Sequence, residues 1–154
     1  MASTHRYSVR CSWAGSTGAG YGEYTRTHTG HTRPATEALT LSADPAFQGD
    51  ANLLNPEQLL VLAAASCQLL SFLAVAARAR LDVVGYEDDA EGEMPEDDPP
   101  LRLTRIVLRP RITLGSAASE DRVRGLVEIA HRQCYIANSL RTDVVVEPTF
   151  AGPQ

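Results

Sequence analysis

The longest apolar run of the chain lies between Asn55 and Arg80, and no residue from Leu59 to Ala77 is charged. Apolar side chains fall on all sides of a helix drawn through this run, which predicts a helix buried on most of its sides. Asn55 is a favourable N-cap, and Pro56 takes the first helical position, where an N–H is not needed. We expect about 24 helical residues, roughly 36 Å long, at the centre of the fold.

The uncharged run approaches the roughly 20 residues that cross a bilayer. Many of its residues are alanine, however, and Ser66, Gln68 and Ser71 interrupt it, so it is less apolar than a leucine-rich span. A core helix is therefore favoured over a membrane helix. One small sheet cannot cover a helix that is apolar on nearly every side, so we also expect a second subunit to bury the remainder.

Alternation of apolar and polar residues from Arg6 to Trp13 predicts a half-buried strand. Cys11 falls on its apolar face, where cysteine behaves as a small hydrophobic residue, so we expect it to pack in the core. Four glycines between Gly15 and Gly22 predict a loop.

The next segments predict two more strands, at Glu23–Thr29 and Glu37–Ser42, followed by a loop at 44–54. His28 and His31 are spaced like a pair of metal ligands, but no acidic or cysteine residue is near them in the sequence. Exposed turn histidines are the favoured interpretation over a zinc site.

After the central helix, residues 82–94 carry a cluster of acids, a proline-rich turn follows, and Leu101–Leu114 carries four arginines. This order predicts a hairpin with ion pairs between its strands. The apolar positions change parity near Thr104 and Arg105, which predicts a bulge there. Pro110 cannot donate to a ladder, which predicts an edge strand at that point.

Ser119 can cap a second helix whose apolar positions lead to Cys134 at its core-facing end. A short turn or helix at Tyr135–Leu140 and a strand at Asp143–Thr149, ended by Pro148, follow. The predicted order is three strands, helix, two strands, helix, strand. This order indicates an α+β fold with antiparallel pairing.

A chain of 154 residues is expected to form a single domain, residues 1–154. The net charge of −5 argues against nucleic acid and anionic membrane surfaces as partners. The N-terminal residues have no apolar signal region, so we expect a cytoplasmic location. Three cysteines in that reducing compartment do not indicate a structural disulfide framework, which leaves redox function or simple packing for each of them.

Several features together carry a resemblance to a known family. They are Asn55-Pro-Glu-Gln-Leu59, Cys67 ten residues after Glu57, a long Ala/Leu helix, and Ala130-His-Arg-Gln-Cys-Tyr-Ile-Ala-Asn-Ser-Leu140. From residue 6 to 148 the chain resembles the OsmC/Ohr family of thiol-dependent peroxidases. The resemblance implies an OsmC-like fold, with antiparallel sheets packed on a long central helix in an intertwined homodimer.

The resemblance also implies an activity, the reduction of organic hydroperoxides without a cofactor. Cys67 would be the peroxidatic cysteine and Cys134 the resolving cysteine of a Cys67–Cys134 disulfide, with a dithiol such as a lipoylated protein as reductant. Family members often have proline where this chain has Tyr135. Of the arginines that could assist Cys67, we favour Arg26 over Arg33.

The chemistry can be weighed from the residues alone. A thiolate cleaves the peroxide O–O bond, so the site must lower a cysteine pKa from about 8.5, usually with a nearby cation. Cys67 lies in mid-helix, so another segment must supply that cation. A second thiol then traps the sulfenic acid and prevents over-oxidation. Two packed core cysteines remain the simple alternative.

Glu57 has two interpretations. In a straight helix its Cα lies about 15 Å from that of Cys67, too far for contact within one chain. It either holds an arginine in place across a dimer interface or only complements the helix dipole.

Two further functions stay open from the sequence. The chain could be a non-catalytic ligand-binding or stress-response protein on the same fold. It could also hold a metal through His131, Cys134 and Cys67, since His-x-x-Cys is a usable ligand spacing.

Overall fold

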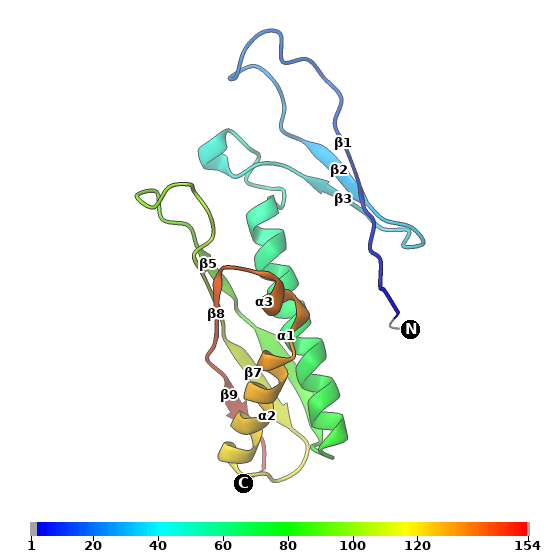
Figure 1. Cartoon of the computed structure of the whole chain (residues 1–154), viewed down its shortest axis with the longest axis vertical. Coiled ribbons are helices and arrows are strands. Elements are labelled where there is room, and N and C mark those ends of the chain that lie inside the picture. Colours follow the sequence, from blue (N-terminus) through cyan, green and yellow to red (C-terminus); the bar gives the residue numbers. More distant parts are fainter. Residues whose placement is uncertain (1–2, 154) are drawn as a thin grey trace. The chain divides into compact units, whose positions relative to one another are not determined.

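The computed structural model describes residues 3–153. The chain folds into two compact units that divide at Leu59, and the long helix α1 (Pro56–Arg78) begins in the first unit and continues through the second (Figure 1). The single domain expected for residues 1–154 stays a prediction.

The first unit holds a three-stranded antiparallel sheet in the order β1-β2-β3. Its strands are β1 (Arg10–Ser12), β2 (His28–His31) and β3 (Ala38–Leu41), and the single-turn 3-10 helix η1 (Pro45–Phe47) follows. The third predicted strand is present within its predicted bounds, whereas β2 shares only His28 and Thr29 with the predicted strand at Glu23–Thr29.

The prediction of a half-buried first strand with a packed Cys11 is wrong. Only Arg10–Ser12 pairs as a strand, Tyr7 is 91% exposed, and Cys11 is exposed. Alternation reports which side chains share a face of a strand, but not whether another element of the chain covers that face. His28 and His31 also differ from expectation, because both lie in β2 and are half-buried.

Helix α1 begins at the predicted cap residue, Asn55, which exchanges two hydrogen bonds with Gln58. The amide of Gln58 donates to Asn55 Oδ1 at 2.8 Å, and the amide of Asn55 donates to Gln58 Oε1 at 3.1 Å. This arrangement is a capping box, in which side chains satisfy two backbone donors that a helix start leaves free. The sequence signal at Asn55-Pro56 is confirmed.

Only one stripe of α1 is buried within the chain, which corrects the expectation of burial on most sides. The buried residues are Ala64, Gln68, Phe72, Val75 and Ala76, whereas Leu62 is 56% and Leu70 62% exposed. The two sheets of the second unit and residues of the shorter helices cover one side of the cylinder, and among residues 3–153 the other side stays exposed. Within residues 3–153, α1 is also the one helix long and apolar enough to span a membrane.

The second unit contains the predicted hairpin. Strand β4 (Val83–Asp88) pairs with β7 (Pro110–Leu114), and β5 (Glu91–Glu93) pairs with β6 (Arg105–Leu108), both antiparallel. Arg109 contacts Glu91 at 2.8 Å, and Arg111 contacts Glu87 at 3.1 Å. These ion pairs account for the opposite charges of the two halves of the hairpin, but exposed ion pairs contribute little stability.

Two details of the hairpin were predicted wrongly. The register shift lies between Val83 and Gly85, not at Thr104 and Arg105, because residues 101–104 are outside the strands. Pro110 is buried at the first residue of β7, which is a central strand between β4 and β9. The first position of a strand tolerates proline, so an edge is not required.

The C-terminal third adds two helices and two strands. Ser119 caps α2 (Glu120–Arg132) by accepting from the amide of Arg122, and α3 (Tyr135–Ser139) follows. Strands β8 (Asp143–Val146) and β9 (Thr149–Ala151) then pair in parallel with β6 and β7. The α+β class is as expected, but the sheets are mixed. A helical connection before β8 permits parallel pairing, which a short turn does not.

Side chains of α1 and α2 meet over the sheet β4-β7-β9 in the main core of the second unit. Phe72, Val123, Val127 and Ile112 are nearly inaccessible to solvent there. This packing fixes how α2 lies on α1, and therefore how the segment after α2 lies near Cys67.

Candidate redox site

Cys67 lies in the middle of α1 and is half-buried. It lines an open depression of about 480 Å³, with Leu70 and Ala74 of the same helix and Ile136 of α3 among its neighbours. A small molecule can therefore reach the Cys67 sulfur along a mostly apolar surface.

Cys134 is held in the interior at the junction of α2 and α3. Val123, Val127 and Ala130 form the buried face of α2, and Cys134 is the next residue on that face, only 1% exposed. Its carbonyl accepts from the side-chain amide of Asn138 at 2.9 Å, which fixes the turn into α3.

The structure brings these two cysteines together. Cys67 lies close enough to Cys134 to raise the pKa of that thiol, and the amide of Ile136 donates to Cys67 Sγ at 3.5 Å. Both thiols are free, so the pair is in its reduced form. Two adjacent thiols of unequal exposure can form a disulfide and be reduced again.

The pKa of Cys134 is raised from an ordinary 9.0 to about 11, mainly by burial and also by the neighbouring Cys67, while hydrogen bonds from the amides of Ala137 and Ile136 oppose the shift. Cys134 is therefore a thiol at neutral pH. Of the two sulfurs, Cys67 is the one exposed to a solvent-borne oxidant, and Cys134 is a protonated partner beneath it.

This shift predicts a loss of stability at high pH. The folded protein keeps the Cys134 proton between about pH 9 and 11, where the unfolded chain releases it. Below about pH 9 Cys134 keeps its proton in both states, so its ionisation should not change the free energy of unfolding of the reduced protein. It should fall by at most about 3 kcal/mol as the pH rises to about 11. Denaturant unfolding under reducing conditions measures this decrease in the free energy of unfolding, and the decrease should be smaller in a Cys134→Ser protein.

Arg26 and Glu57 lie in the first unit, where both line a cavity of about 360 Å³ with the aromatic side chains of Trp13, Tyr24 and Phe47. Arg26 donates to the carbonyl oxygens of Tyr24 and Tyr21, and its guanidinium lies 3.9 Å from the Tyr24 ring centroid. The guanidinium is therefore held in one place.

Arg33, the alternative to Arg26, is exposed in the turn after β2. Arg26, the favoured arginine, and Glu57 therefore line the same cavity.

Two polar residues of the second unit were not predicted as part of the site. Gln68 is fully buried, donates to the carbonyl of Val127 at 3.4 Å, and has no partner for Oε1 within the described chain. The Tyr86 hydroxyl is likewise buried without a partner there. A glutamine beside Cys67 in an otherwise apolar run was the available signal. Tyr86 carried none, because it fits the hydrophobic pattern of a strand.

The metal interpretation finds no support in the arrangement of side chains. Within residues 3–153, no three His, Cys, Asp or Glu side chains converge as ligands, and His131 Nδ1 is buried without a partner. Cys67 and Cys134 meet without a third ligand.

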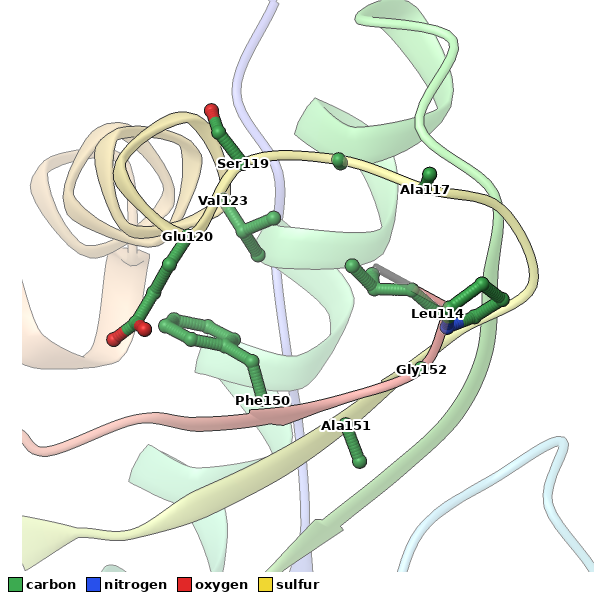
Figure 2. A pocket seen from close by; sticks show the side chains of 10 residues that line it. Leu114, Ala117, Ser119, Glu120, Val123, Phe150, Ala151 and Gly152 are labelled. Atoms are coloured by element: carbon green, nitrogen blue, oxygen red, sulfur yellow. The ribbon is translucent and has the colours of Figure 1, made fainter.

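A second hollow of the same unit, about 750 Å³, lies between β9 and the start of α2 (Figure 2). Leu114, Val123 and Phe150 line it, and Ser119 and Glu120 lie on its α2 side. It contains neither cysteine, so it is separate from the thiol pair.

Comparison with known proteins gives matches along most of the chain. The uncharacterized protein YmaD of Bacillus subtilis is 24% identical over 135 residues, which cover 88% of this chain and 81% of YmaD. An OsmC-like protein of unknown function from Vibrio cholerae shares the fold with a TM-score of 0.85 and 27% identity, over 95% of this chain and 100% of that one.

An organic hydroperoxide resistance protein from Elizabethkingia anophelis, crystallised with thiocyanate, matches with a TM-score of 0.71 and 16% identity, over 98% of this chain and 100% of that one. At that identity the likeness shows the fold alone. The family model of OsmC-like proteins matches residues 49–149, which include both Cys67 and Cys134. This chain belongs to the OsmC-like protein family.

Proposed function

We propose that this protein is a thiol-dependent peroxidase that reduces organic hydroperoxides through Cys67 and a Cys67–Cys134 disulfide. The observation that supports it most is the thiol pair itself. An accessible Cys67 receives a backbone hydrogen bond, and a buried, protonated Cys134 lies near enough for Cys67 to raise its pKa. Solved structures of the same fold include organic hydroperoxide resistance proteins.

In the proposed cycle the Cys67 thiolate attacks one oxygen of the hydroperoxide. The O–O bond breaks, the alcohol leaves, and Cys67 becomes a sulfenic acid. Cys134 then attacks the Cys67 sulfur, so that the disulfide forms and water leaves. A dithiol reduces the disulfide, becomes a disulfide itself, and returns both protons.

Formation of the Cys67 thiolate requires favourable electrostatics. The Ile136 amide supplies one hydrogen bond to the sulfur. We propose that Arg26 supplies the positive charge that activates Cys67, with Glu57, which lines the same cavity as Arg26, holding the guanidinium in place. The alternative role of Glu57, complementing the dipole at the start of α1, is compatible with its position in the first turn.

The depression around Cys67 supports an organic substrate over hydrogen peroxide. Leu70, Ala74 and Ile136 give it apolar walls, and an alkyl or aryl group loses contact with water by lying there. Dithiothreitol-dependent consumption of cumene hydroperoxide, compared with hydrogen peroxide, tests the proposal. Failure to consume either peroxide would contradict it.

A ligand-binding or stress-response protein without turnover is the second candidate. The observation that favours it is the cavity of the first unit, which has aromatic walls beside a fixed guanidinium and two carboxylates and so suits a ligand with an apolar body. This function predicts saturable binding of such ligands and no peroxide consumption by the purified protein.

We also propose that the protein is a homodimer in the cytoplasm. The open side of α1 presents Leu62, Leu70 and Leu73 to solvent in the single chain. An apolar face of that kind on a central helix is suited to pairing with the same face of a second copy.

Oxidation with one equivalent of cumene hydroperoxide should join Cys67 and Cys134 and leave Cys11 free. The first two thiols are in contact, whereas Cys11 is exposed on β1 of the other unit. Peptide mapping after alkylation measures this outcome. A disulfide at Cys11, or unmodified Cys67, would count against the assignment, and a Cys11→Ser protein should give the same map as the wild type.

A further inference from the structure

The first unit contains a cysteine that the proposed peroxidase cycle does not use. Cys11 lies in β1 with its side chain exposed, and the other two cysteines of the chain, Cys67 and Cys134, belong to the second unit. Core packing therefore does not explain this sulfur, and its own unit offers no second thiol for a disulfide. Among residues 3–153 no metal-binding group of three His, Cys, Asp or Glu side chains forms either.

Cys11 lines the cavity of about 360 Å³ in the first unit. Trp13, Tyr24 and Phe47 supply its aromatic walls. A cavity of this size accommodates a small organic molecule, and aromatic walls favour one with an apolar body. A molecule bound there lies against a wall that includes the Cys11 side chain.

His28 lines the same cavity and lies on the same face of the sheet as Cys11. In the register of β1 and β2, Cys11 is opposite Gly30, and His28 precedes Gly30 by two residues. Side chains two residues apart in a strand share a face, and a diagonal pair across two strands lies about 7–8 Å apart, within reach of a long side chain. Gly30 has no side chain that could separate the thiol from the imidazole.

The hydrogen bond of His28 determines which of its ring nitrogens can act as a base. Its Nδ1 lies 2.7 Å from the carbonyl oxygen of Arg26. Because a carbonyl oxygen only accepts, Nδ1 carries the proton, and the neutral ring has its free lone pair on Nε2. His28 is therefore a base oriented by a backbone carbonyl, and an oriented histidine is a common activator of a cysteine nucleophile.

The cavity also contains charges of both signs. Arg26 donates to the carbonyl oxygens of Tyr24 and Tyr21, and a guanidinium has further N–H groups that can donate to an oxygen of a ligand. Asp44 and Glu57 line the cavity as well. Two carboxylates beside one guanidinium do not favour a thiolate by charge alone, so ionisation of Cys11 calls for a base.

We infer that Cys11 is a site of covalent capture for α,β-unsaturated carbonyl compounds with an apolar body, and that His28 is its base. The inference goes beyond the proposed peroxidase and does not depend on it. His28 Nε2 takes the Cys11 proton, the sulfur forms a bond to the β-carbon, and the C=C electron pair moves toward the carbonyl oxygen. His28 then returns the proton to the α-carbon, so a thioether forms without an oxidant, a reductant or a leaving group.

Conjugate addition uses each of the groups that line the cavity. The aromatic walls hold the apolar body, the spare N–H groups of Arg26 stabilise the oxygen that becomes negative, and His28 moves the proton. A disulfide would need a second thiol in this unit. Displacement of a leaving group would use neither the returned proton nor the donors of Arg26.

The test is incubation of the full chain with cinnamaldehyde at about pH 7 without peroxide, followed by borohydride reduction and peptide mapping of the cysteines. The chain contains no lysine, so aldehyde condensation with lysine amines does not compete. We expect the Cys11 adduct to form roughly 10- to 50-fold faster than the adduct of N-acetylcysteine, because only a few per cent of a free thiol is ionised at pH 7. Acrolein, which lacks the apolar body, should show a smaller acceleration.

His28→Gln should lose this acceleration at about pH 7 and react like the wild type at about pH 10, where a thiol ionises without a base. A structural role of His28 would slow the reaction at both pH values. Tyr24, Arg26, Asp44 and Glu57 line the cavity in both proteins, so their charges do not alter the comparison. His31→Gln is the matched control and should match the wild type, because a position three residues after His28 lies on the other face of β2.

A Cys11 adduct that forms no faster than that of N-acetylcysteine would overturn the inference. Equal rates in His28→Gln and the wild type at about pH 7, or slower reaction of His28→Gln at both pH values, would overturn the role of His28. Equal acceleration of cinnamaldehyde and acrolein would contradict selection by the cavity. The assay contains no peroxide, so a protein that captures cinnamaldehyde at Cys11 but consumes no hydroperoxide would support this inference and contradict only the peroxidase proposal.

Discussion

A Cys67→Ser protein is expected to consume no organic hydroperoxide, even in a single turnover. The first chemical step requires a thiolate, and a serine hydroxyl at the same position is neither ionised nor a comparable nucleophile toward oxygen. Stopped-flow measurement of one turnover with cumene hydroperoxide, followed by intact mass, shows the result. Because Cys67 lies in an open depression, this substitution should leave the fold intact.

Cys134→Ser is expected to behave differently from Cys67→Ser. It should consume about one equivalent of peroxide and then stop as a sulfenic acid or oxidise further, because no resolving thiol remains. The mass of the stalled protein should be higher than that of the reduced protein by one or more oxygen atoms.

The two cysteine variants also separate the alternatives. Peroxide reduction at the wild-type rate by Cys67→Ser would overturn the mechanism. A binding protein predicts no rapid consumption by the wild type, so that neither change has an effect. A metal site predicts that both variants lose metal together. Cys11→Ser, at an exposed thiol outside the pair, is the control and should keep full activity.

Leu62→Glu is expected to convert the proposed dimer into a monomer. Leu62 is 56% exposed on the open side of α1 and is not among the residues that line the Cys67 depression. Burial of a leucine side chain contributes about 1.5–3 kcal/mol, and a two-fold interface contains the residue twice. Dimer dissociation should thus become roughly 10²- to 10⁴-fold more favourable.

Sedimentation velocity over a range of protein concentrations measures this change. Leu101→Glu makes the same chemical change at a leucine that is 48% exposed in a loop, and it should leave the assembly unaltered. A wild-type protein that stays monomeric at micromolar concentration would contradict the dimer proposal, as would a Leu62→Glu protein that dimerises like the wild type.

The features that were predictable from the sequence depend on local interactions. The caps at Asn55 and Ser119 involve atoms only three residues apart, so their residue types are sufficient to place both helix starts. The hairpin was equally predictable from the sequence, because its acidic and basic strands are neighbours in the chain. Cys67 and Cys134 were paired by family resemblance, and no local rule brings them together.

The wrong predictions concern burial and pairing partners, which depend on segments far away in the sequence. Cys11 and Tyr7 belong to an alternating segment, but both are exposed among the residues that the structure describes, and only Cys11 lies in a strand. Pro110 was expected at an edge because the sequence gives no sign that β9 would pair beside it. Tyr86 resembles any strand tyrosine until the position of α2 is known.

The parallel pairing of β8 and β9 has a consequence for synthesis of the chain. β6 and β7 already have antiparallel partners in the hairpin, but each keeps an open edge until β8 and β9 emerge from the ribosome. During translation of residues 115–142 these two edges can add strands from other nascent chains. Helix α2, which forms from local contacts, is then the element available to cover the incomplete sheets before β8 and β9 are synthesised.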